Sequence, residues 1–175
     1  MRTQSSTSAL SPDVEALVKA TVQRIRAGGG RVVGLIGFSQ GTKVVAGLLR
    51  ASELVGEYGL TGEDVEWCDF RFAVSVCGSY APLLMPGGVR ERLPTGVDAL
   101  EGKVRVPTFH VLGAKDEWGW AGRGLIERHY EQGEGRSEVV EWDMGHYYPV
   151  EVEQNERIAK WAVAVWKGIE GGEVR

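Results

Sequence analysis

Residues 32–41 read Val-Val-Gly-Leu-Ile-Gly-Phe-Ser-Gln-Gly, and this stretch decides the fold. Its first seven residues are apolar or glycine, a run typical of a short parallel strand that is covered on both faces. From Ser39 onward the pattern changes, because apolar residues recur at the spacing of a helix, at positions 44, 45, 48 and 49. The segment Gly37-Phe38-Ser39-Gln40-Gly41 is therefore predicted to form the turn between a strand and a helix.

A serine in a Gly-x-Ser-x-Gly turn of this kind is held above the edge of the sheet. Gly37 and Gly41 are expected to let neighbouring backbone approach without a Cβ clash. The first N–H groups of the helix, that of Gln40 foremost, would point to where an oxyanion forms. The motif thus predicts Ser39 as a nucleophile, and the alternative interpretation is a tight glycine turn without chemistry.

The elements around this turn alternate between helices and strands. Helices are expected from Ser11-Pro12 to Gly28, over residues 122–132 and through residues 158–169, and further strands over residues 69–76, 104–112 and 137–142. A long segment with Gly and Pro, residues 78–102, is expected to be a loop. This order predicts an α/β fold with a parallel sheet of about four strands and helices on both faces, with ligands bound at the carboxyl ends of the strands.

Composition limits the class of protein. The 175 residues have a net charge of -4 and 43% hydrophobic residues, which favours one globular domain and gives no basic surface for nucleic acid. We expect that domain at residues 12–170, between a flexible N-terminal tail (1–11) and a C-terminal tail (171–175). No apolar run is long enough for a membrane helix, and the polar N-terminus lacks the apolar stretch of a secretory signal.

The positions of the cysteines, the histidines and one run of glycines add three further expectations. Cys68 and Cys77 flank one predicted strand, so we expect two reduced thiols and a cytoplasmic protein. The three histidines and the scattered carboxylates lack the spacing of metal ligands, so no metal is expected. Gly28-Gly29-Gly30 precedes a strand instead of opening a helix, so no phosphate-binding loop and no cofactor are expected.

A serine nucleophile needs a base, and the chain offers three histidines. His110 lies inside a predicted strand, where a packed core histidine is the simpler interpretation. His129 lies on a predicted helix and is expected to be structural and partly exposed. His146 follows Gly145 in a loop just past the fourth strand, at the end of the sheet where the base is needed, and is therefore the predicted base.

The third member of such a site is a carboxylate between the serine and the histidine in chain order, after a strand. Asp116 fits this position, because it follows the third predicted strand. It would accept the Nδ1–H of His146 and hold the imidazole in the reactive tautomer. Asp143 and Glu117 remain the alternatives.

Aromatic and apolar residues near these strand ends are candidates for a substrate pocket. They are Phe38, Tyr80, Leu83, Trp118, Trp120 and Tyr147. For the two tryptophans the alternative interpretation is packing over the adjacent helix. For the Tyr80 to Pro86 segment it is an ordinary surface loop with a packed centre.

Three segments resemble the fungal serine hydrolase (FSH) family of the α/β-hydrolase superfamily. They are Gly-Phe-Ser-Gln-Gly at 37–41, Gly-Ala-Lys-Asp at 113–116 and Gly-His-Tyr-Tyr-Pro at 145–149. The resemblance covers roughly residues 12–168. It implies an esterase or thioesterase with Ser39 as nucleophile, His146 as base and Asp116 as acid. It also implies, for members in biosynthetic clusters, the release of a polyketide chain from an acyl-carrier domain of a synthase.

One part of the family pattern has no match. Family members open with a strand and a His-Gly loop that supplies a second oxyanion N–H, and we expect two or three strand–helix units to be missing here. The strand at 32–38 would then lie at a sheet edge, which invites pairing with a second copy of the chain. The alternatives to a chain-releasing hydrolase are a general carboxylesterase for small esters and a weak or inactive hydrolase that acts as a binding partner.

Overall fold

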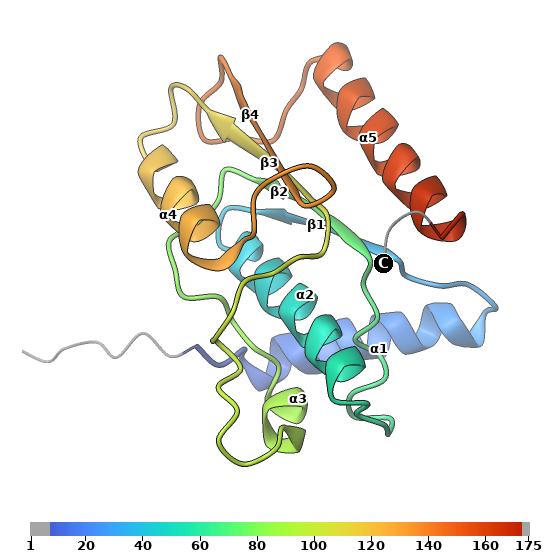
Figure 1. The fold of residues 1–175 in the computed structure, drawn as a ribbon. Coiled ribbons are helices and arrows are strands. Elements are labelled where there is room, and N and C mark those ends of the chain that lie inside the picture. The colour runs from blue at the N-terminus through green and yellow to red at the C-terminus, as the bar shows by residue number, and fades with distance from the viewer. Residues whose placement is uncertain (1–7, 173–175) are drawn as a thin grey trace, which may run out of the picture.

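The computed structural model describes residues 8–172 (Figure 1). Within that range, four strands form one parallel sheet in the order β1-β2-β3-β4. Their bounds are β1 Gly34–Phe38, β2 Phe72–Val76, β3 Thr108–Gly113 and β4 Ser137–Trp142. The expected α/β fold with a parallel sheet is therefore confirmed.

Helices cover both faces of the sheet (Figure 1). The helices of the described chain are α1 (Pro12–Ala27), α2 (Gly41–Glu57), α3 (Gly87–Arg92), α4 (Gly119–His129) and α5 (Val152–Glu170). One apolar core joins α2, α4 and Val22 of α1 to one face, and a second joins Ile158 and Trp161 of α5 to the other. This two-sided cover explains why β2 and β3 are apolar almost throughout, since both of their faces are buried.

β1, the strand that leads into the Gly-x-Ser-x-Gly turn, differs from β2 and β3 in how it is covered. Among the described residues, β1 pairs with β2 alone, so its other edge is open. Ile36 in the middle of β1 is 63% exposed, although its strand is as apolar as β2. β1 thus lies at an edge of the described sheet, as the resemblance to the family implies.

Several elements differ in their bounds from those expected: β1 and β2 begin two and three residues later, and α5 begins six residues earlier. The third strand begins at Thr108 instead of residue 104, because Pro107 has no N–H for the ladder and Val104 forms an isolated bridge with Tyr130. The helix expected at 122–132 begins at Gly119 and ends at His129, where the chain turns toward that bridge. The short helix α3 lies inside the segment expected to be a loop.

The chain ahead of α1 contacts the loop before α3. Met85 donates its N–H to the carbonyl of Ser8 at 2.8 Å and accepts the N–H of Leu10 at 2.8 Å, and the Leu10 side chain is buried. This part of the expected N-terminal tail is therefore packed against the domain. The remainder of both expected tails, residues 1–7 and 173–175, lies outside the described residues. No helix in the described range is both long and apolar enough to span a bilayer.

Candidate active site

The turn between β1 and α2 holds Ser39 in an unusual conformation. Its φ is 51°, in the left-handed region that residues with a Cβ rarely adopt. Thr42 stabilises the turn, because its N–H and its hydroxyl both donate to the Ser39 carbonyl, at 3.1 and 2.6 Å. This is the strained strand-to-helix turn that the motif predicts.

The two glycines of the motif contribute differently. A Cβ on Gly37 would lie 2.9 Å from the Gly41 carbonyl oxygen and 2.8 Å from a methyl group of Val45, so only glycine fits there. A Cβ on Gly41 would meet nothing within 4 Å among the described residues. The expectation that both glycines let neighbouring backbone approach is therefore wrong for Gly41 within the described residues.

Ser39, His146 and Asp116 come together at the carboxyl ends of the strands. The Ser39 hydroxyl lies 2.9 Å from Nε2 of His146, and Nδ1 of His146 lies 2.9 Å from Oδ2 of Asp116. With a proton on Nδ1, the imidazole donates to the carboxylate and accepts from the hydroxyl, which is the arrangement of a nucleophile, a base and an orienting acid.

Asp116 occupies the acid position, and the two alternatives lie elsewhere. Its carboxylate is only 1% exposed and also accepts the N–H of Trp118 at 2.8 Å through Oδ1. Asp143 is 78% exposed and pairs with Lys115 at 2.8 Å. Glu117 is an exposed residue whose side chain takes part in none of the hydrogen bonds found in the described chain.

The N–H of Gln40 has the place expected of an oxyanion donor. Gln40 is the residue before α2, and the other N–H groups of this turn are either paired or part of the helix. Within the described range, no hydrogen bond uses the Gln40 N–H. A donor that is free beside Ser39, at the positive end of a helix of 17 residues, can stabilise negative charge there.

Cys77, for which the sequence predicts only a reduced thiol, lies next to Asp116 and His146. The Cys77 sulfur, a carboxylate oxygen of Asp116 and a ring nitrogen of His146 all lie within 4.8 Å of one another. Burial, and then the charge of Asp116, raise the pKa of the Cys77 thiol to about 11, so the thiol is protonated near neutral pH. The Cys77 sulfur lies 3.7 Å from the carbonyls of Gly145 and Tyr147, which flank His146. The only sequence signal for this contact is that Cys77 follows β2 directly.

The other two histidines belong to the core. His110 is 1% exposed and its Nε2 lies 3.3 Å from the Ser137 hydroxyl, as expected of a packed strand histidine. His129 was expected to be partly exposed, but it is 3% exposed. It is buried because its Nε2 accepts the N–H of Leu83, which brings the 79–86 loop over it.

We expect the fold to lose stability as the pH falls below about 6.5, because of His110. Burial lowers the pKa of His110 from 6.5 to about 3. The folded protein therefore keeps the ring neutral, while the unfolded chain binds a proton. The contribution is fully present above pH 6.5 and is lost as the pH falls toward 3, at roughly 1 kcal/mol per pH unit.

Urea unfolding at about pH 7 and about pH 5 measures this effect. The His110→Asn variant, which has no titrating ring, should lose less unfolding free energy between the two conditions than the parent chain. An equal or larger loss in the variant would show that His110 does not set the acid sensitivity.

Five of the six predicted pocket residues lie at the surface near the site. Their exposed fractions range from 40% for Phe38 to 62% for Trp120, and the other three are Tyr80, Trp118 and Tyr147. The Phe38 ring lies 5.2 Å from the His146 ring. Leu83 is the exception, because its side chain is 1% exposed within the core that joins α2 and α4. Its assignment to the pocket is therefore wrong.

A cavity of about 730 Å³ lies at the other end of the strands. It is lined by the second half of α2 and by the segments that lead into β2, β3 and β4. These segments stand at the amino ends of the strands, whereas Ser39 stands at the carboxyl end of β1. The candidate active site is thus an open rim and not this cavity.

Comparison with known proteins agrees with this geometry. The family model described as "Serine hydrolase (FSH1)" matches residues 3–158. An esterase named citA from Monascus ruber is 35% identical over 132 residues, with 69% of this chain and 49% of the relative covered. A probable esterase named TOX9 from Cochliobolus heterostrophus is 30% identical over 149 residues, with 70% and 52% covered. The chain therefore spans about half the length of the curated relatives that it matches.

One solved structure has a similar fold. It comes from work on two fungal esterases from Rhizomucor miehei, and it superposes with a TM-score of 0.53 at 14% identity. The match covers 94% of this chain and 62% of the other. The chain thus shares its α/β fold with that esterase structure. The match to the family model over residues 3–158, together with these relatives, shows that the chain belongs to the FSH1 family of serine hydrolases.

Proposed function

We propose that this chain hydrolyses carboxylic esters through an acyl-enzyme on Ser39. The observation that carries the proposal is the unbroken line of hydrogen bonds from the Ser39 hydroxyl through His146 to the buried Asp116 carboxylate, both at 2.9 Å. Family membership and relatives named as esterases support the same reaction class.

The proposed reaction has two halves. Ser39 Oγ attacks the acyl carbonyl while Nε2 of His146 takes the hydroxyl proton, and the oxyanion faces the N–H of Gln40. His146 then gives that proton to the leaving alcohol or thiol as the carbonyl reforms. In the second half, His146 removes a proton from water, the hydroxide attacks the acyl carbonyl, and Ser39 leaves with the proton returned from Nε2. Asp116 stabilises the imidazolium in both halves.

A fluorophosphonate probe tests the proposal directly, because it forms a covalent bond only with an activated serine. The native chain should be labelled, and Ser39→Ala should not be. Ser11→Ala is the matched control, since Ser11 is exposed ahead of α1 and its side chain makes no capping bond. Absence of labelling in well-folded native protein would favour the alternative, a binding partner that keeps the fold without the chemistry.

We extend the proposal to the acyl donor. The resemblance to the family implies an acyl chain, such as a polyketide, that leaves the thioester of a carrier domain. The position of the candidate active site on an open rim supports this, because a bulky carrier-bound acyl group can reach Ser39 there without entering a closed cavity. The alternative, a carboxylesterase for small oxygen esters, uses the same three residues.

A further inference from the structure

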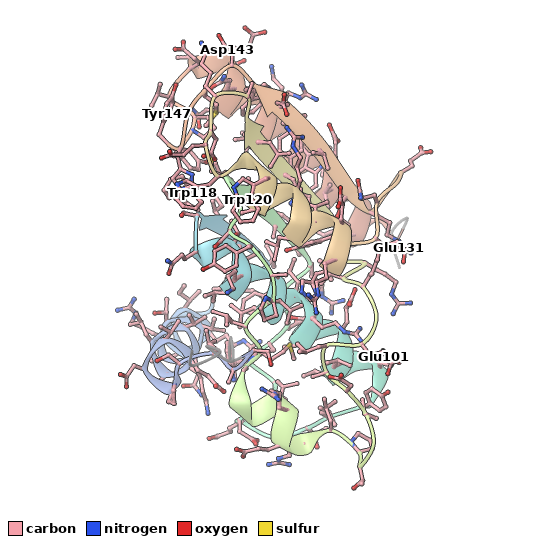
Figure 2. All side chains as sticks on the ribbon, turned by 90° about the vertical axis from the view of Figure 1, so that its left-hand side faces the viewer. Glu101, Trp118, Trp120, Glu131, Asp143 and Tyr147 are labelled. Carbon is pink, nitrogen blue, oxygen red and sulfur yellow. The ribbon has the colours of Figure 1, made fainter. Side chains whose placement is uncertain are left out.

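Three aromatic rings form a platform at the rim of the candidate site. The rings of Tyr80 and Trp120 are parallel to within 5°, with centroids 6.2 Å apart, which is an offset stacked pair. Trp118 lies 6.3 Å from Trp120 at a tilt of 46°. Figure 2 shows the two tryptophans next to one another where α4 begins. We call Tyr80, Trp118 and Trp120 the aromatic platform.

The platform remains accessible although its rings contact one another. The exposed fractions are 53% for Tyr80, 48% for Trp118 and 62% for Trp120. Large aromatic side chains are costly to leave in water, and a contiguous exposed group of them is a sign of a binding surface. On α4 itself, Ala121 and Leu125 are buried, whereas Trp120 exposes most of its side chain.

Short hydrogen-bonded links fix the platform to the reacting residues. The N–H of Ser79, next to Tyr80, donates to the Thr42 hydroxyl at 3.0 Å, and that hydroxyl donates to the Ser39 carbonyl. On the other side, the N–H of Trp118 donates to the Asp116 carboxylate. These bonds tie the backbone next to Tyr80 and the backbone of Trp118 to the segments that carry Ser39 and Asp116, so the platform lies next to the candidate site.

A positive charge sits at the same place. The ammonium of Lys43, one helical turn after Ser39, lies 5.3 Å from the centre of the Tyr80 ring. In the part of the chain that the structure describes, Lys43 is in none of the ion pairs. A cation over an aromatic face attracts electron-rich rings, so the charge complements a flat aromatic ligand better than a saturated one.

We infer that the aromatic platform binds a flat aromatic acyl group of the substrate while its carbonyl reacts at Ser39. This inference rests on the proposed function and names its substrate class. A planar ring can extend the stack that Tyr80 and Trp120 begin, whereas a saturated ring of the same carbon number cannot lie flat on it. The platform thus gives the site a preference for shape that the three reacting residues alone do not have.

Two esters with one leaving group test the inference: 4-nitrophenyl 2-naphthoate, whose acyl group is flat, and 4-nitrophenyl decahydro-2-naphthoate, whose acyl group is puckered. After correction for their rates with hydroxide, the chain should favour the flat ester by about tenfold in kcat/KM. Tyr80→Leu and Trp120→Leu should each reduce that preference by about fivefold or more. Tyr58→Leu is the matched control, because Tyr58 is an exposed tyrosine at the far end of α2. It should keep the preference.

A binding measurement separates this inference from the proposed function. Ser39→Ala protein should bind 2-naphthamide in a calorimetric titration, and adding Trp120→Leu should weaken that binding by about fivefold or more. If Ser39→Ala binds 2-naphthamide but the native chain neither hydrolyses esters nor reacts with the fluorophosphonate, the proposed function is overturned and the platform stands. Ester hydrolysis with no preference for the flat acyl group, or with a preference that survives both platform variants, would overturn the platform.

Discussion

Replacing Asp116 by Asn is expected to lower kcat for a 4-nitrophenyl ester by about 10³–10⁴-fold. Asp116 accepts two hydrogen bonds, from the Trp118 N–H and from Nδ1 of His146. An asparagine has one acceptor oxygen, and the backbone N–H of Trp118 can only donate, so the oxygen stays there and the new amide faces His146. The amide then donates to Nδ1, which leaves the proton on Nε2 and removes the base from Ser39.

Asp143→Asn is the matched control, and its kcat should change by less than about threefold. Asp143 pairs with Lys115 on the exposed surface, and such pairs contribute little to structure or chemistry. Circular dichroism should show that both variants keep the fold. If Asp143→Asn lost more activity than Asp116→Asn, the assignment of the acid would be wrong.

Gly47→Ala is expected to destabilise the domain by about 3 kcal/mol, with a fall in Tm of roughly 10 °C. Gly47 lies in the middle of α2, and a Cβ there would stand only 1.7 Å from the carbonyl oxygen of Leu84. That carbonyl is backbone and cannot rotate away. The segment is also held by the bond from the Leu84 N–H to the Lys43 carbonyl at 3.0 Å. The loop must therefore separate from α2.

The same helix supplies the control. A Cβ on Gly56 meets nothing within 4 Å in the described chain, so Gly56→Ala should leave stability unchanged or raise it by up to about 1 kcal/mol through helix propensity. Thermal unfolding of both variants measures the difference. Equal Tm values for the two variants would show that the Gly47 contact does not hold the loop. Because this loop continues from Tyr80, Gly47→Ala should also disturb the aromatic platform.

The meeting of Ser39, Asp116 and His146 could be predicted from sequence because each of them follows a strand. Parallel strands end at one edge of a sheet, so Ser39, Asp116 and His146 had to approach one another once the strands after which they stand were recognised. The strand pattern is local, and so is the strained turn at Ser39. The edge position of β1 was implied by the resemblance to the family, whose first strand–helix units have no match here.

The contacts between distant side chains depended on the tertiary structure. Residues in one predicted loop point in different directions, which is why Tyr80 lies in the platform whereas Leu83 is buried in the core. The same holds for Cys77, whose place behind Asp116 and His146 depends on the meeting of three loops. Spacing along the chain determines where strands and turns begin and end. Which side chain is buried, and which ring stacks on which, depends on contacts that form only when distant segments pack together.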